Sequence, residues 1–427
     1  MNKIFNPEKK DWSQVLKRPT QTVSDIEDVV NEVFAKVEKE GDPVLKQYTQ
    51  KFDGVTLKSL QVSEVEISEA ANRIGQELKN AIAIAKKNIE TFHKAQETNK
   101  VEVETTKGVF CWQEKRPIQK VGLYIPGGSA PLFSTILMLA VPANIAGCTE
   151  IVLCTPPNKE GKVHPAILYT ANLCGVTQIF KVGGIQAIAG MTFGTESISK
   201  VYKIFGPGNQ YVTVAKQIAT KYGISIDMPA GPSELLVMAD DSANASFVAS
   251  DLLSQAEHGA DSQVILVSTS KAMIHAVEEE VEKQLEKLPR KAIAEKAIEN
   301  SKLVFVTDSQ SAIDLINEYG PEHYILCVED EEIYLTQIMN AGSVFIGNYT
   351  PESAGDYASG TNHTLPTNGY AKQYSGVNLD SFKKSMTFQK INTEGIKEIG
   401  RAIELMAEAE GLQAHKNAVT LRLESLK

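Results

Sequence analysis

The chain contains 427 residues, of which 42% are hydrophobic and 22% are charged, and its formal net charge is -10. Domains cluster near about 100 to 200 residues, so this length predicts at least two of them, and the composition excludes a disordered or fibrous protein. The acidic balance and the lack of a basic run argue against nucleic acid as a partner.

The amino terminus, MNKIFNPEKKDW, lacks the apolar core of a secretory signal, so export is not indicated. The most apolar stretch, residues 131–148, is interrupted by Pro142 and Asn144 and is short for a bilayer span of about 20 residues. It predicts a buried helix, and no membrane partner is expected. Five cysteines without a CxxC pair favour reduced core thiols in a cytoplasmic enzyme.

The first hundred residues are rich in helical patterns, including VSDIEDVVNEVFAKVEKEGD (23–42), which carries apolar residues at helical spacing and reaches a capping glycine at Gly41. From residue 120, short β-branched runs alternate with small-residue turns and amphipathic segments, as in KVGLYIPGG, EIVLCTP, QIFKVGG and KIFGPG. A second series follows with SELLVMAD, QVILVST, LVFVTD, HYILCVE and SVFIGN. This alternation predicts an α/β protein with parallel sheets. The last fifty residues predict two helices divided at Gly411.

Three glycine-rich turns follow consecutive predicted strands: YIPGGSAP (124–131), VGGIQA (182–187) and FGPGN (205–209). Backbone N–H groups at such turns bind phosphate when a helix follows. None of the turns completes GxGxxG, so the usual dinucleotide fingerprint is absent, and each alone fits a simple tight turn equally well. Their repetition in consecutive βα units favours a ligand at that sheet edge.

The carboxy-terminal half holds most of the histidines. GPEHY places Glu322 beside His323 in a turn after Pro321, where both side chains can reach one cavity. ESAGDYASGTNHTLP carries Asp356 and His363 in a segment without periodicity, which predicts a functional loop. AEAEGLQAHKNA places Glu410 and His415 on either side of Gly411.

The segment DLLSQAEHG places Gln255 and His258 three positions apart in what the pattern predicts to be the last turn of a helix. Residues at this spacing are neighbours on any helix, and a histidine before a glycine also suits the helix end, so a structural role is one alternative. Together with Asp356 and His415 they offer two nitrogens and two oxygens to zinc or a neighbouring first-row metal. Glu322 and His323 then remain as acid and base groups.

At these residues the sequence resembles the histidinol dehydrogenase family, because seven motifs match that family in order. They span about residue 120 to residue 423 and read GLYIPGGSAPLFSTILMLAVPA, KIFGPGN, DMPAGPSE, DLLSQAEHG, YGPEH, SVFIGNYTPESAGDYASGTNHTLPT and AHKNAVTLR. The helical first hundred residues fit the family as well.

The resemblance implies one zinc ion per subunit, NAD as cofactor and L-histidinol as the small-molecule substrate. The implied zinc ligands are Gln255, His258 and Asp356, with His415 supplied by the second subunit of a homodimer. The implied substrate contacts are Ser233, Gln255, His258, Glu322, His323, Asp356, His363, Glu410 and His415, and the implied NAD contacts are Tyr124, Gln186 and Asn209.

For the fold, the resemblance implies two incomplete Rossmann-like domains with parallel sheets in an intertwined homodimer with shared active sites. We expect a helical N-terminal arm at 1–20 and a first α/β domain at 21–119 and 233–370 that carries most metal and catalytic residues. The NAD-binding domain is expected at 120–232, and a helical segment that reaches the second subunit at 371–427.

The implied reaction is the NAD-dependent four-electron oxidation of L-histidinol to L-histidine through L-histidinaldehyde, the last two steps of histidine biosynthesis. His323 is expected to remove the hydroxyl proton and Glu322 to activate water for the aldehyde. Two alternatives are a zinc hydrolase, in which Glu322 activates a metal-bound water, and a non-catalytic metal-dependent binding protein.

Overall fold

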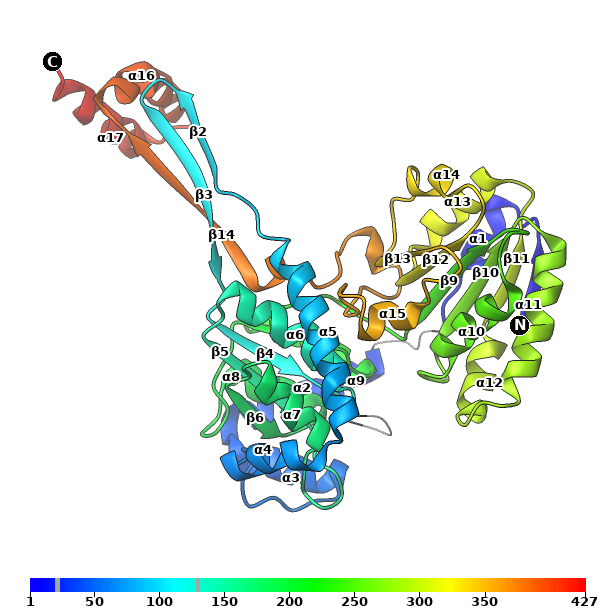
Figure 1. Ribbon diagram of the computed structural model, residues 1–427. Coiled ribbons are helices and arrows are strands. Elements are labelled where there is room, and N and C mark those ends of the chain that lie inside the picture. Colours follow the sequence, from blue (N-terminus) through cyan, green and yellow to red (C-terminus); the bar gives the residue numbers. More distant parts are fainter. Residues whose placement is uncertain (20–23, 128–130) are drawn as a thin grey trace.

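The protein, described here by a computed structural model over residues 1–19, 24–127 and 131–427, has two parallel sheets flanked by helices and one projecting arm (Figure 1). The predicted α/β class with parallel sheets is confirmed. Part of the YIPGGSAP turn, residues 128–130, lies outside the described residues.

One sheet has six parallel strands in the order β1-β11-β10-β9-β12-β13. Its strands are β1 (Asn2–Phe5), β9 (Glu234–Ala239), β10 (Gln263–Ser268), β11 (Lys302–Phe305), β12 (His323–Cys327) and β13 (Ser343–Ile346). The strand β9 is buried throughout, and its successive side chains enter cores on opposite faces: Leu235 and Val237 on one, Leu236 and Met238 on the other. A continuous apolar run is therefore what this central strand requires.

The helices of this half are α1 (Trp12–Val15), α10 (Ala245–Ala256), α11 (Lys271–Leu285), α12 (Lys291–Glu299), α13 (Ser309–Tyr319), α14 (Glu331–Leu335) and α15 (Glu352–Tyr357). Helices α10, α11 and α12 share one core, and α1 and α13 share the other. The N-terminal segment, expected to be a helical arm, instead begins with β1, which pairs with β11 at the sheet edge.

The second sheet has five parallel strands in the order β6-β5-β4-β7-β8. Its strands are β4 (Lys120–Tyr124), β5 (Glu150–Thr155), β6 (Gln178–Lys181), β7 (Lys203–Phe205) and β8 (Ser225–Ile226). The intervening helices are α6 (Phe133–Ala146), α7 (Pro165–Leu173), α8 (Gly184–Phe193) and α9 (Gln210–Lys221). The apolar helix predicted at 131–148 is α6, and its side chains are almost all buried.

Four further helices pack on this five-stranded half: α2 (Ser24–Glu40), α3 (Asp42–Asp53), α4 (Glu64–Ala70) and α5 (Gln76–Lys94). Helix α2 contacts α8 and α9, and α5 contacts α6. The sequence analysis grouped residues 21–119 with 233–370, whereas the structure places helices α2 to α5 against the sheet of residues 120–232. The helical periodicity located these helices correctly, but it carries no information about which sheet they cover.

The arm is a three-stranded antiparallel sheet of β2 (Val101–Thr106), β3 (Val109–Pro117) and β14 (Lys383–Ile391), in the order β14-β3-β2. It carries α16 (Thr393–Ala409) and α17 (Gln413–Glu424) at its tip, well away from both parallel sheets (Figure 1). These two helices pack on each other and are divided at Gly411, as predicted. The expected helical segment at 371–427 thus also contains the strand β14.

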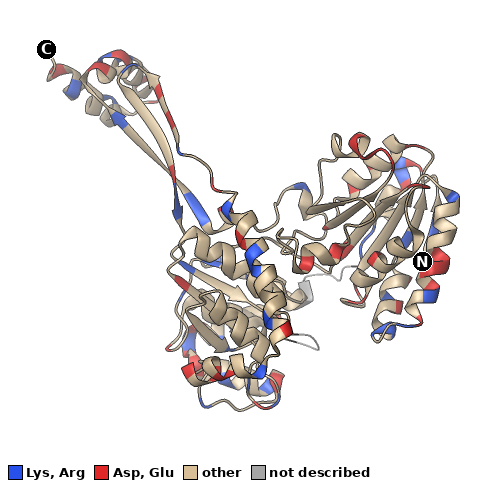
Figure 2. Cartoon of the chain, viewed as in Figure 1, with Lys and Arg blue, Asp and Glu red and all other residues tan. Residues whose placement is uncertain are grey.

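Acidic and basic side chains occur in both halves and in the arm (Figure 2). Within the described ranges, no helix combines the length and apolarity needed to cross a membrane. All five cysteines are free thiols, and four of them are buried.

Candidate active site

A cleft of about 1190 Å³ is lined by residues from both parallel sheets. Ten of the predicted site residues line it: Tyr124, Gln186, Asn209, Ser233, Gln255, His258, Glu322, His323, Asp356 and His363. The structure therefore brings together residues that are up to 239 positions apart in the chain.

Gln255 lies in the last turn of α10 and is 1% exposed. Its Nε2 donates to the backbone oxygen of Glu234 (3.2 Å), whereas its Oε1 is buried without a hydrogen-bond partner among the described residues. A buried amide oxygen without a partner is costly, so it is a strong candidate for binding a ligand. His258 is exposed and lies in a turn two residues after Ala256, where α10 ends, whereas the sequence analysis expected it in the last turn of the helix.

Asp356 lies near His258 and a third group, Glu352, which the sequence analysis did not identify. One ligand atom from each of the three residues lies within 4.8 Å of the others. Glu352 is 1% exposed, and burial first, followed by the charge of Asp356, raises its pKa well above the ordinary value. A buried carboxyl group close to a second carboxyl group is stabilised in its ionised form by a cation.

Asp356 belongs to α15, so the predicted loop at this position is partly helical. The helix has only six residues, which is too short for a periodic apolar pattern to appear in the sequence. Glu352 and Asp356 are four positions apart and share one helix face, a spacing that would have identified Glu352 if the helix had been recognised.

His323 is the first residue of β12 and is 4% exposed. Its Nδ1 lies 3.2 Å from the backbone oxygen of Glu234 and 3.3 Å from Nε2 of Gln255. Because the Glu234 oxygen can only accept, we assign the proton to Nδ1, the tautomer in which Nδ1–H donates to Glu234. The Nε2 atom is then an unprotonated base, and it has no hydrogen-bond partner among the described residues. Burial lowers the pKa of His323 to about 4, which keeps the ring neutral at pH 7.

Glu322 is also buried, and its Oε2 accepts a hydrogen bond from the backbone N–H of Glu234 (2.9 Å). Burial raises its pKa well above the ordinary value, and the charges of Glu234 and Asp356 act in the same direction. A carboxyl group with a raised pKa in a cleft is suited to general acid and base catalysis near neutral pH.

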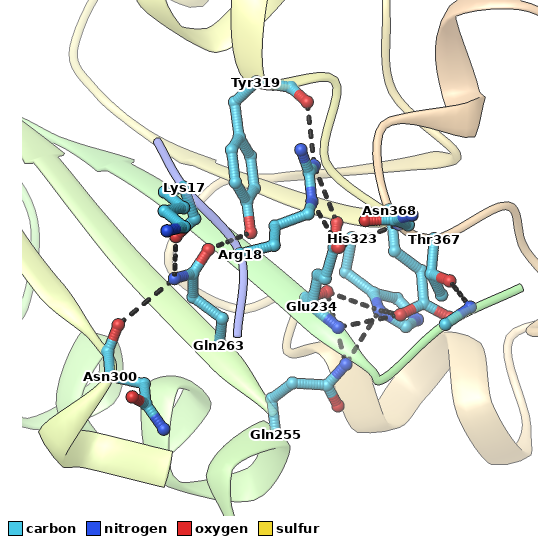
Figure 3. A network of polar contacts seen from close by, with 12 residues as sticks. Lys17, Arg18, Glu234, Gln255, Gln263, Asn300, Tyr319, His323, Thr367 and Asn368 are labelled. Carbon is cyan, nitrogen blue, oxygen red and sulfur yellow. Dashed lines mark hydrogen bonds and ion pairs between the residues drawn. The ribbon is translucent and has the colours of Figure 1, made fainter. Parts of the chain in front are cut away.

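Glu234 binds both of these residues through its backbone and is itself held by Arg18 (Figure 3). The Arg18 guanidinium donates from Nε and Nη2 to the two carboxylate oxygens of Glu234, and Nη2 also donates to the backbone oxygen of Tyr319 (2.8 Å). The guanidinium carbon lies 3.9 Å from the centroid of the Tyr319 ring. Burial raises the pKa of Glu234, and the hydrogen bonds and charge of Arg18 oppose that rise.

His363 and Ser233 complete the part of the cleft near the six-stranded sheet. The ring of His363 lies between the Thr135 hydroxyl (Nε2, 3.2 Å) and the backbone oxygen of Asp356 (Nδ1, 2.9 Å). Burial lowers its pKa, so the ring is neutral near pH 7. His363 therefore links α6 of one half to α15 of the other.

The predicted NAD contacts lie at the ends of three strands of the five-stranded sheet or the helices that follow them. The Tyr124 hydroxyl accepts a hydrogen bond from the N–H of Gly184 (3.0 Å), and burial raises the pKa of Tyr124 to about 12. Gln186 is 2% exposed in the first turn of α8, and Asn209 caps α9 by accepting from the N–H of Val212. In open parallel sheets, ligands bind at this carboxyl edge.

Glu410 and His415 do not line the cleft. Glu410 ends α16 and His415 is exposed on α17, both at the tip of the arm (Figure 1). Within one chain, these two predicted site residues are therefore not brought to the others.

A family model described as histidinol dehydrogenase matches residues 16–423. The chain is 59% identical to the histidinol dehydrogenase of Bacteroides thetaiotaomicron over 427 residues, which cover all of both chains. It is 53% identical to that of Escherichia coli K12 over 417 residues, covering 97% of this chain and 95% of the relative. The crystal structure of histidinol dehydrogenase from Elizabethkingia anophelis matches with a TM-score of 0.98 and 56% identity, over 100% of this chain and 98% of that one.

Proposed function

The chain belongs to the histidinol dehydrogenase family, a family of oxidoreductases of histidine biosynthesis, and we propose that it oxidises L-histidinol to L-histidine with NAD and one zinc ion per subunit. The observation that carries the proposal is the position of His323 Nε2. This base has no hydrogen-bond partner among the described residues and lies in a cleft beside a potential metal site. The same cleft extends to the glycine-rich strand ends of the second sheet.

Gln255, His258 and Asp356 are the residues of this chain that would hold zinc. The unpartnered Oε1 of Gln255 and the closeness of His258 to Asp356 support this donor set, which combines nitrogen and oxygen as zinc prefers. When bound, zinc would fix the substrate's nitrogen atoms and so orient its alcohol carbon. Glu352 adds a buried carboxyl group next to this set, which a bound cation would favour in its ionised form.

His323 acts as the base that removes the hydroxyl proton of histidinol. Its Nδ1–H is bound to the Glu234 oxygen, which fixes the ring and leaves Nε2 to accept the proton. NAD would supply the acceptor for the hydride, and Tyr124, Gln186 and Asn209 are the residues that would hold it.

Glu322 acts in the second oxidation, where the aldehyde must first gain water. Its carboxylate takes a proton from the attacking water, and its raised pKa makes it a stronger base than an ordinary carboxylate. His323, after releasing its first proton to solvent, then removes the proton from the hydrated aldehyde, and a second NAD would accept the hydride.

Glu410 and His415 reach the site from a second subunit. They lie on an arm that leaves the body of its own chain, and the cleft lacks them (Figure 1). The strands and helices of the arm also expose large apolar side chains, including Val101, Met406 and Leu421, as a surface that packs on another chain does.

The test is NADH absorbance at 340 nm after L-histidinol and NAD are mixed with the purified protein, with two NADH expected per histidinol consumed. A zinc hydrolase or a metal-dependent binding protein reduces no cofactor, so an absence of NADH with metal-loaded protein would contradict the proposal. Metal content is measured on the same sample. Removal of the metal by a chelator should abolish NADH formation, and zinc should restore it; full activity in metal-free protein would rule out the zinc site.

A further inference from the structure

The cleft contains an acidic side chain that the proposed reaction does not use. Asp53 lines it together with Tyr124 and Gln186, and all three belong to the half of the molecule built on the five-stranded sheet. His323 and Glu322, by contrast, belong to the half built on the six-stranded sheet. Asp53 thus lies on the side of the cleft away from the proposed base.

The position of Asp53 is unfavourable for a carboxylate on local grounds. It is the last residue of α3, which ends at Gly54 in the left-handed conformation (φ 74°), and a negative charge is disfavoured at the negative end of the helix dipole. Its Oδ2 is buried and has no hydrogen-bond partner among the described residues. Burial also raises the pKa of this carboxyl. Among the described residues no hydrogen bond to Oδ2 offsets these costs, which is typical of a group that binds a ligand.

Charge and hydrogen bonding define which ligand group fits there. A carboxylate accepts hydrogen bonds and repels anions, so it matches a pair of hydroxyl groups and opposes a phosphate. The adenosine ribose of NAD presents 2′- and 3′-hydroxyls, and in NADP the 2′-hydroxyl carries a phosphate. Acidic residues bind this ribose in other dinucleotide-binding folds.

The length of the dinucleotide determines which of its two ends lies near Asp53. In the proposed function the nicotinamide ring must lie near the carbon beside His323, so the adenosine end extends into the half of the cleft that contains Asp53. We propose that Asp53 accepts hydrogen bonds from the 2′- and 3′-hydroxyls of the adenosine ribose and thereby makes this cleft select NAD over NADP. This inference rests on the proposed use of NAD.

A lysine in the same cleft explains why selection of NAD over NADP needs an acidic group. Lys162 also lines the cleft, is exposed, and pairs with Glu160 only at 3.7 Å. Its ammonium group would attract a phosphate in the cleft. The carboxylate of Asp53 opposes that attraction.

The experiment compares wild type, Asp53→Asn and Glu69→Gln as metal-loaded holoenzymes, with the dissociation constants of NAD and NADP measured by isothermal titration calorimetry. Glu69 is exposed on α4 and does not line the cleft, so its variant is a control for the loss of one negative charge in the same half. Thermal unfolding without nucleotide is measured on the same samples.

We expect wild type to bind NAD more tightly than NADP, and Asp53→Asn to reduce this preference by about 10- to 100-fold, the range expected for a lost hydrogen bond to a charged group. The affinity for NAD should fall and that for NADP should rise, while Glu69→Gln keeps the wild-type ratio. The unfolding temperature of Asp53→Asn should equal or exceed that of wild type, because asparagine relieves the unfavourable charge at the helix end.

Three results would overturn the inference. The first is an unchanged NAD to NADP ratio in Asp53→Asn. The second is an equal weakening of both nucleotides together with a lower unfolding temperature, since that indicates a structural role for Asp53. The third is a wild-type protein that binds no NAD, which would overturn the proposed function itself and is recognised before any variant is tested.

Discussion

Glu322 and His323 are adjacent in the chain, but their environments give them different chemistry. His323 has a fixed ring and a free Nε2, whereas Glu322 keeps a carboxylate whose pKa is raised by burial. Alcohol oxidation requires a base and no water, and aldehyde oxidation requires both. Glu322→Gln should therefore slow histidinaldehyde oxidation by about 10²- to 10⁴-fold, as loss of a general base does, and slow histidinol oxidation less. His323→Asn should slow both.

Single-turnover NADH formation from each substrate measures this difference directly. Equal slowing of both substrates by Glu322→Gln would exclude a specific role in hydration. A His323→Asn protein that retains full rate on either substrate would exclude His323 as the shared base.

Asp251 carries a second consequence of burial, this time for stability. It is 8% exposed on α10, and burial raises its pKa to about 7. Between the unfolded pKa of about 3.9 and the folded pKa of about 7, the folded state keeps a proton that the unfolded state releases. The contribution of this proton to the free energy of unfolding is therefore complete below about pH 4 and is lost as pH rises through 7. The free energy of unfolding of Asp251→Asn, compared with wild type, should thus increase as pH rises. By pH 8 this increase should reach about 2 to 4 kcal/mol.

Urea unfolding of metal-free protein at pH 5 and pH 8 tests this expectation. Asp241→Asn is the control, because Asp241 is exposed, and its difference from wild type should not change with pH. The same flat difference for Asp251→Asn would show that the carboxyl is ionised in the folded state at both pH values.

At the scale of elements, the N-terminal segment is fixed to the start of β9 by one buried ion pair. Arg18 binds both carboxylate oxygens of Glu234, whose side chain is 3% exposed, and Glu234 also accepts from the N–H of Asn368 (2.8 Å). Removing one partner leaves a buried charge uncompensated, so Arg18→Met should lower the free energy of unfolding by about 3 to 5 kcal/mol. Replacing both partners in Arg18→Met/Glu234→Met should restore part of that loss.

Denaturant unfolding of the two variants and wild type provides the measurement. A midpoint for Arg18→Met that equals the wild-type value would mean that the pair contributes no net stability. In that case the ion pair serves only to connect the segment with the strand that binds Glu322 and His323.

The same elements show what the sequence could and could not predict. The parallel sheets followed from β-branched runs separated by amphipathic helices. The gathering of Glu322, His323, Gln255 and Asp356 in one site was implied by the resemblance to a known family, not by any local pattern. The Arg18–Glu234 pair joins positions 216 apart and leaves no local signal. The strand β1 is only four residues long, and its pairing with β11 depends on a contact across 300 positions. The arm strand β2 did leave a trace, because Val101 and Val103 alternate with acidic residues.

At the scale of the whole molecule, the arm separates two predicted site residues from the cleft of their own chain. The predicted residues Glu410 and His415 lie on its tip, and the remaining predicted residues line the cleft in the body. If the arm of each subunit completes the cleft of the other, two differently damaged chains can together form one intact site. One chain carries His258→Ala, which damages the cleft, and the other carries His415→Ala, which damages the arm.

Each variant should be inactive as a homodimer, because every site then has one lesion. After subunit exchange, half of the chains at statistical mixing are in heterodimers. In each heterodimer one site combines the intact cleft of one chain with the intact arm of the other, and its second site carries both lesions. We therefore expect about one quarter of the wild-type activity per site. Exchange is verified by mass spectrometry of the native dimers with one variant isotopically labelled. If the arm instead returned to its own cleft, every site would keep one lesion, so verified heterodimers without recovered NADH formation would place His415 in the site of its own chain. An active His415→Ala homodimer would place His415 outside the site.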